Sequence, residues 1–156
     1  MAPTNTMPEI YHRAVPTDPK SGCDLTAWKP DVIVINLATN DFRKGVPDRE
    51  MWTGAWHAFI LRLRGYYPDA RIIVALGTMM SDDWPPGQAH LTHARELLQN
   101  VVARFHSEGD SRVEFLEMAP QRAEDGYGAD WHPSVRTHGR MAEALVQAIT
   151  ARPSAR

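Results

Sequence analysis

The sequence has one cysteine, Cys23, and lacks any long apolar run. A single cysteine excludes an intramolecular disulfide and a cysteine-based zinc site. No segment approaches the roughly 20 apolar residues of a membrane-spanning helix, so no membrane association is predicted. The 17 basic and 19 acidic residues nearly balance, giving a net charge of −2. This balance provides no positive field to attract nucleic acid, and we expect no nucleic-acid partner.

The amino-terminal region also lacks the apolar segment of a signal peptide, because polar residues and four prolines interrupt its first twenty residues. No leader is predicted from this chain, and its localisation stays unknown. Residues 1–30 show little periodicity and predict an extended, irregular arm with a short helical turn near residues 8–12. We expect one domain over residues 31–152 and a tail at residues 153–156.

The remainder alternates between short apolar runs and helical patterns. Strands are predicted at residues 31–37, 71–76 and 112–118, and helices at residues 48–64, 88–106 and 134–151. This order predicts a three-layer αβα fold, with a parallel sheet between helices. Sites in such sheets form where the strands end, so we expect the chemistry in loops 38–47, 77–87 and 119–133.

Asn40 directly follows the first predicted strand, in the run Ala38-Thr39-Asn40-Asp41. A side-chain amide at this position can donate a hydrogen bond to a developing oxyanion. An Asx-turn that merely ends the strand explains the same residues. Spacing alone leaves both interpretations open.

Asp130, Trp131 and His132 follow the third predicted strand. A loop histidine can act as a general base near neutral pH when a carboxylate fixes its tautomer. Side chains two residues apart in an extended stretch point the same way, so Asp130 and His132 are expected to meet. A surface aspartate, followed by a His-Pro pair that shapes a helix start, is the alternative interpretation.

Together these segments resemble a known family. The runs I-N-L-A-T-N-D-F and G-A-D-W-H-P-S resemble the SGNH, or GDSL-like, hydrolase superfamily. Within it, they look like carbohydrate esterase family 2, whose members remove acetyl groups from plant polysaccharides and are often secreted. The run T-M-P-E-I-Y-H-R at residues 6–13 also resembles the segment that precedes the Asn-Asp block in that family. The resemblance covers nearly the whole chain.

The resemblance implies roles for individual residues. Asn40 matches the oxyanion-hole asparagine, His132 the catalytic base, and Asp130 the acidic partner, which some members replace with a backbone carbonyl. Trp131 matches an aromatic residue at that site. Trp84, in the loop after the second strand, could stack on a sugar ring or pack as a lid. The implied substrate is a small acylated compound or acetylated carbohydrate, and neither metal nor cofactor is implied.

Two departures from the family pattern stand out. Ala38 occupies a position where the family usually has glycine, and its Cβ could crowd the turn beside the oxyanion site. The Gly-Asp-Ser block that carries the nucleophile is absent from this sequence, as is the glycine block that follows it in the family. No serine here follows a strand and precedes a helix, the setting that a nucleophile needs, so the nucleophile is unidentified.

The missing blocks belong to the first two strands of the family's sheet, which has the order 2-1-3-4-5. The first strand of this chain would then be an interior strand with a bare edge. An apolar, unpaired edge invites pairing with another chain. We therefore expect either a homo-oligomer or residues 1–30 folded over the edge.

Other candidates are weaker. His90 and His93 lie three apart on a helix without a matching carboxylate, which is more typical of solvated surface than of a metal site. Nothing beside Cys23 suggests an activated thiol.

The leading hypothesis is a carboxylic-ester hydrolase in which a serine attacks the acyl carbon, His132 takes its proton and Asn40 holds the oxyanion. A catalytically inactive half-domain that serves as a binding or assembly module is the alternative. An unrelated flavodoxin-like domain ranks last, because no glycine-rich phosphate loop follows the first strand.

Overall fold

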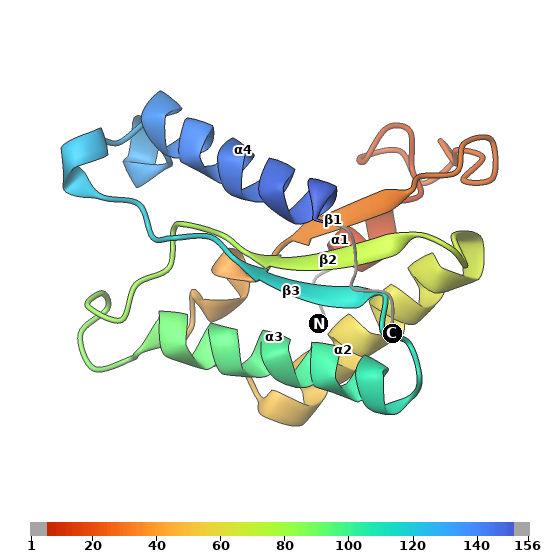
Figure 1. Ribbon diagram of the computed structural model, residues 1–156, viewed down its shortest axis with the longest axis horizontal. Helices are drawn as coiled ribbons and strands as arrows, with labels where there is room; N and C mark the ends of the chain where they lie inside the picture. Colours follow the sequence, from red (N-terminus) through yellow and green to blue (C-terminus); the bar gives the residue numbers. More distant parts are fainter. Residues whose placement is uncertain (1–5, 152–156) are drawn as a thin grey trace.

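The computed structural model describes residues 6–151 as a three-stranded parallel sheet with helices on both faces (Figure 1). The strands are β1 (Val32–Asn36), β2 (Arg71–Leu76) and β3 (Val113–Glu117), in that order across the sheet. The α-helices are α1 (Met7–Ile10), α2 (Arg49–Tyr66), α3 (His90–Ser107) and α4 (Val135–Thr150). The predicted αβα fold is confirmed, and each predicted strand or helix after residue 30 ends within two residues of its observed bounds.

One face of the sheet builds the main core. Ile35, Ile72 and Val74 alternate toward α2 and α3, where they pack against the apolar faces of both helices. Ile60 of α2 and Leu98 of α3 are fully buried there. The β-branched residues of β1 and β2 pack well on a pleated surface. Their burial in this core stabilises a sheet of only three strands.

Among the described residues, α4 alone covers the opposite face (Figure 1). Thr137 is the only buried residue of α4, so apolar packing holds this helix weakly. Arg71 of β2 supplies a polar attachment: it makes two bonds, of 2.9 and 2.8 Å, to the Glu114 carboxylate. It also donates to the carbonyls of Ala148 and Ile149 at 3.0 and 2.9 Å. These bonds satisfy carbonyls at the end of α4 that have no partner within the helix.

We expect the substitution Arg71→Met to lower the free energy of unfolding by about 2 kcal/mol, because charge-assisted bonds to a partly buried carboxylate are lost. Urea denaturation followed by circular dichroism measures this change. Arg49→Met is the matched control, since Arg49 pairs with Glu96 where both side chains are about half exposed. Such an exposed pair contributes about 0–1 kcal/mol. Equal losses in the two variants would contradict this role of Arg71.

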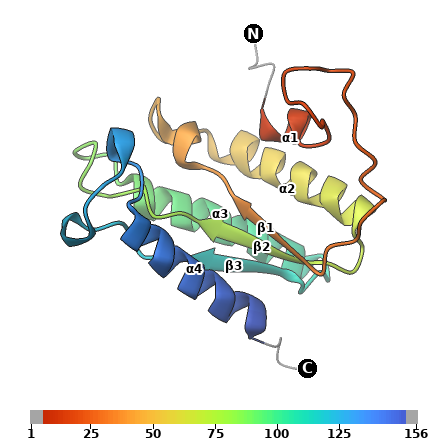
Figure 2. The ribbon, with the colours of Figure 1, turned by 90° about the horizontal axis from the view of Figure 1, so that it is seen from above.

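The amino-terminal arm lies beside α2 rather than on the sheet (Figure 2). The ring of Tyr11 packs edge-on against Phe59 at 5.3 Å, and the Arg62 guanidinium lies 5.1 Å from the centre of the Tyr11 ring. Arg62 also donates to the Pro8 carbonyl. A capping box between Thr6 and Glu9 begins α1.

The outer edge of β1 has no partner strand within residues 6–151, since β1 pairs only with β2. Residues 6–30 add no strand to this edge, and Tyr11 of the arm packs against Phe59 of α2. Residues 1–5, together with the predicted domain limits at 1 and 152 and the tail at 153–156, lie outside the described part of the chain. Over that part, no helix is both long and apolar enough to cross a membrane.

Candidate active site

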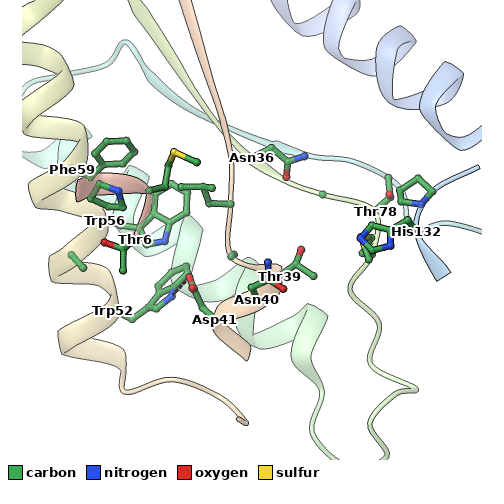
Figure 3. Close-up of a pocket in the computed structure, with 18 of the residues that line it drawn as sticks. Thr6, Asn36, Thr39, Asn40, Asp41, Trp52, Trp56, Phe59, Thr78 and His132 are labelled. Carbon is green, nitrogen blue, oxygen red and sulfur yellow. Dashed lines mark hydrogen bonds between the residues drawn. The ribbon is translucent and has the colours of Figure 1, made fainter. Parts of the chain in front are cut away.

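A cavity of about 770 Å³ opens where β1 and β2 end (Figure 3). It brings together the turn after β1, the loop after β2 and the loop that precedes α4, which are the three loops expected to carry the chemistry. Asn40 and His132 both line it. Figure 3 shows Trp56 and Phe59 on one side of the end of β1, His132 and Thr78 on the other, and Asn40 between them.

The orientation of His132 is set by its own loop. Its Nδ1 lies 2.9 Å from the carbonyl oxygen of Ala129. A carbonyl can only accept a hydrogen bond, so this contact requires the proton on Nδ1. In the neutral imidazole, Nε2 then carries the lone pair that can accept a proton.

Backbone hydrogen bonds also fix the conformation of the loop that carries His132. The Gly128 amide donates to the His132 carbonyl at 2.7 Å, and the His132 amide donates to Ala129 at 3.0 Å. A Cβ on Gly128 would lie 3.1 Å from the Pro133 carbonyl oxygen, so this close approach favours glycine. Asp130 and Trp131 both have left-handed backbone conformations, with φ of 50° and 62°.

Gln121 is a positioning residue that the sequence analysis missed. Its side-chain amide donates to the Trp131 carbonyl at 2.9 Å, and its backbone amide donates to the Thr78 carbonyl at the same distance. Gln121 therefore joins the His132 loop to the loop after β2. No local signal marks this residue in the sequence, because its role depends on two segments that meet only in the fold.

The predicted contact between Asp130 and His132 rested on an extended backbone, and that premise is wrong. Asp130 lies in a short 3-10 turn, η3 (Ala129–Trp131), with φ 50° and ψ 41°. No side-chain hydrogen bond in the described part of the chain joins the Asp130 carboxylate to His132, and the Ala129 carbonyl holds the ring instead. A catalytic role for Asp130 stays a prediction.

Asn40 lies in a second 3-10 turn, η1 (Thr39–Phe42), that follows β1. The turn is anchored to α2 because the Trp52 indole N–H donates to the Asp41 carboxylate at 2.8 Å (Figure 3). Phe42 is buried, with its ring edge-on to Trp52 and to His90. With its neighbours fixed in this way, Asn40 is left exposed at the cavity wall.

Ala38 begins this turn with φ 99° and ψ −43°, a conformation that is strained for any residue with a Cβ. We expect Ala38→Gly to raise the free energy of unfolding by about 0.5–1 kcal/mol, since relief of about 1–3 kcal/mol of strain exceeds the loss of one buried methyl group. Thermal denaturation of the purified chain measures the change. The control Ala142→Gly, at an exposed position of α4, should cost about 1 kcal/mol. A similar loss in both variants would show that Ala38 is unstrained.

Trp84 and Trp131 lie outside the cavity wall. Both are exposed, at 74% and 72% of their surface, and Trp131 packs edge-on against Tyr127. The Trp84 loop is tied to α3, because the Asp82 carboxylate accepts from the hydroxyl and amide of Thr92. These bonds, led by that of the Thr92 hydroxyl, hold the pKa of Asp82 below its usual value. Binding of substrate by either tryptophan stays a prediction.

No serine of residues 6–151 lines the cavity, although the hydroxyls of Thr6, Thr39 and Thr78 do. Thr78 is buried, with its Oγ1 3.7 Å from the Met141 sulfur. No hydroxyl of residues 6–151 is hydrogen-bonded to His132. The same residues include no group of three or more metal-ligating side chains, and Cys23 is exposed on the arm, where it contacts the His12 carbonyl.

Similar proteins include several esterases. Cellulase/esterase CelE of Acetivibrio thermocellus is 39% identical over 144 residues, which cover 91% of this chain and 17% of that protein. An acetylxylan esterase/glucomannan deacetylase of Cellvibrio japonicus is 29% identical over 122 residues, which cover 78% of this chain and 31% of that protein.

The fold is shared with solved carbohydrate esterases. A family two carbohydrate esterase from Clostridium thermocellum, in complex with cellohexaose, superimposes with a TM-score of 0.87 at 34% identity. The match covers 95% of this chain and 43% of that one. A Corynascus family 2 enzyme gives a TM-score of 0.82 at 30% identity, covering 95% of this chain and 46% of that one. This chain thus spans less than half of these solved relatives.

The family model described as GDSL-like Lipase/Acylhydrolase matches residues 5–140. That match includes the turn that carries Asn40 and the loop that carries His132. The chain therefore belongs to the GDSL-like lipase/acylhydrolase family.

Proposed function

We propose that this chain supplies the general base and an oxyanion donor of a carboxylic-ester hydrolase that removes acetyl groups from carbohydrate. One observation carries the proposal: Asn40 and His132, from loops far apart in the sequence, line one cavity. The bond from Nδ1 of His132 to the Ala129 carbonyl leaves Nε2 as the acceptor. An amide donor and an imidazole acceptor are the groups that acyl transfer requires beside its nucleophile.

In the proposed reaction, a serine hydroxyl from outside residues 6–151 attacks the acetyl carbonyl carbon. Nε2 of His132 takes the serine proton and then gives it to the departing sugar oxygen. The side-chain amide of Asn40 donates to the oxyanion of each tetrahedral intermediate. Water, deprotonated by His132, then attacks the acetyl-serine, releasing acetate and restoring the serine. The Ala129 carbonyl stabilises the imidazolium, and the nearby charge of Asp130 is proposed to add to this effect.

The substrate class rests on the relatives and on exposed aromatic side chains. Curated relatives from Cellvibrio japonicus are named acetylxylan esterase/glucomannan deacetylase, and the Clostridium thermocellum esterase is solved with cellohexaose. A polysaccharide extends well beyond the acetyl group that it carries. Trp84 and Trp131, exposed outside the cavity, are suited to stack on further sugar rings.

A second candidate is a carbohydrate-binding module without catalytic activity. The observation that favours it is that no serine of residues 6–151 lines the cavity. The two candidates differ in one respect that an experiment can address: when a suitable serine is supplied, only the esterase releases acetate.

The test is a hybrid polypeptide in which residues 6–151 of this chain replace the matched part of the Clostridium thermocellum esterase. We expect it to release acetate from acetylated xylo-oligosaccharides, and we expect this chain alone to release none above a heat-denatured sample. A folded hybrid that binds the oligosaccharide without releasing acetate would favour the binding module.

A further inference from the structure

We propose that Arg140 of α4 is a positioning residue of the reaction, because its ion pair with Asp125 fixes the loop that carries His132. The inference rests on the proposed function, in which His132 is the general base. Arg140 does not line the cavity, so its effect on the reaction passes through the loop at residues 119–133. A change at this position should therefore slow proton transfer while the fold and the substrate contacts stay intact.

The loop at residues 119–133 has no buried apolar side chain to anchor it. Figure 1 shows the chain between β3 and α4 extending past the sheet before it turns back toward α4. None of residues 119–134 is buried, and His132 itself is exposed. A segment of this kind is held by its hydrogen bonds and ion pairs, and it opens locally when these are lost. The position of the imidazole therefore depends on polar attachments.

An ion pair between Arg140 and Asp125 attaches this loop to α4. The Arg140 guanidinium lies 2.5 Å from Oδ2 of Asp125, and the two side chains keep only 28% and 11% of their surface exposed. Partial burial reduces screening by solvent and salt, so this pair is stronger than an exposed one. Thr137, three residues earlier in α4, is fully buried. The part of the helix that carries Arg140 is therefore firmly seated in the fold.

Backbone pairing transmits the position of Asp125 to His132. Tyr127, two residues after Asp125, forms an antiparallel bridge with Pro133. One residue further along, the Gly128 amide donates to the His132 carbonyl at 2.7 Å. The two halves of this turn therefore move together, and a shift of Asp125 displaces the imidazole from its place in the cavity wall.

Asp125 has a second cationic partner that makes no such attachment. Arg122 donates from Nε to Oδ2 of Asp125 at 3.2 Å and pairs with Glu124 at 2.8 Å. All three residues belong to the loop, and the Arg122 side chain is 52% exposed. Loss of this pair removes a cation beside Asp125 and leaves the connection between the loop and α4 in place. A comparison of the two arginines therefore separates attachment of the loop from the charge around Asp125.

Amide hydrogen exchange in this chain tests the attachment without reference to activity. Arg140→Met removes the charge, and Nε of Arg140 is buried without a hydrogen-bond partner among residues 6–151, so no bond from Nε is lost. We expect the Gly128 and His132 amides to exchange about tenfold faster in Arg140→Met, because one charge-assisted bond no longer opposes local opening. Arg122→Met should leave both rates unchanged. The amides of β2 should keep their rates in both variants, which shows that the fold is intact.

Kinetics of the hybrid polypeptide test the effect on the base. We expect Arg140→Met to lower kcat for acetate release by about 10-fold to 100-fold, with KM little changed, since a small displacement of the base is costly in the transition state. Arg122→Met should retain kcat, and Arg140→Lys, which keeps the charge, should restore part of the loss. In the His132→Ala background, Arg140→Met should cause no further loss, because residues that act as a unit are not additive.

Circular dichroism at the assay temperature establishes that each variant is folded. If Arg140→Met does not fold, Asp125→Asn, which keeps the side-chain shape and removes the charge, takes its place with the same expected results. The inference is overturned if the Gly128 and His132 amides keep their original rates, if kcat equals that of Arg122→Met, or if the loss persists in the His132→Ala background. An unaltered hybrid that releases no acetate would contradict the proposed function, whereas the exchange rates would still decide whether Arg140 fixes the loop.

Discussion

Replacement of His132 by alanine is expected to lower kcat for acetate release by the hybrid by a factor on the order of 10⁴, with little change in KM. The loss follows from the geometry, because Nε2 of His132 is the acceptor left free by the bond between Nδ1 and the Ala129 carbonyl. Without it, neither the serine proton nor the leaving sugar oxygen has a partner for proton transfer. Steady-state kinetics on acetylated xylo-oligosaccharide measures both constants.

His138 is the informative control, because a second imidazole lines the same cavity. It lies in the first turns of α4. We expect His138→Ala to change kcat only slightly. If His138→Ala abolished turnover while His132→Ala retained it, the assignment of the base would be wrong.

Replacement of Asn40 by alanine is expected to reduce kcat of the hybrid by about 10²–10³, the loss typical of one oxyanion donor. Asn40→Asp should lose a similar amount, because a carboxylate keeps the shape of the side chain and cannot donate. The loss should appear in kcat rather than in KM, because the oxyanion exists only in the transition state and the tetrahedral intermediates.

A second asparagine provides the comparison for this prediction. Asn36 also lines the cavity. Its side chain lies close to Gly77, since a Cβ built on Gly77 would be 2.7 Å from Oδ1 of Asn36. We expect Asn36→Ala to retain most of the activity. A larger loss for Asn36→Ala than for Asn40→Ala would transfer the oxyanion role to Asn36.

The strands and helices could be predicted because their signals are local. The apolar run at residues 71–76 coincides with β2, and the helical spacing of Trp52, Trp56, Phe59 and Ile60 is the buried face of α2. The sheet edge at which Asn40 and His132 meet followed from a general property of parallel sheets. Periodicity and strand order therefore predicted the fold and the edge of the sheet at which Asn40 and His132 line one cavity.

The details of the site depended on contacts that no local pattern contains. The Ala129 carbonyl can reach His132 only because Asp130 and Trp131 adopt left-handed conformations, which are unusual for residues with a Cβ. Gln121 joins two loops through tertiary hydrogen bonds. The sequence predicted either self-association or an arm over the β1 edge, and it held no signal for the contact of Tyr11 with Phe59 and Arg62 beside α2.

The central claim is that His132 and Asn40 act on a hydroxyl from outside residues 6–151. Mass spectrometry after fluorophosphonate treatment tests it most directly, with the hybrid polypeptide and this chain alone as the two samples. We predict one modified serine in the hybrid, on the part contributed by the Clostridium thermocellum esterase, and no modified residue of this chain in either sample. A label on any serine of this chain, or on Thr39 or Thr78 at the cavity wall, would place the nucleophile within it and contradict the account.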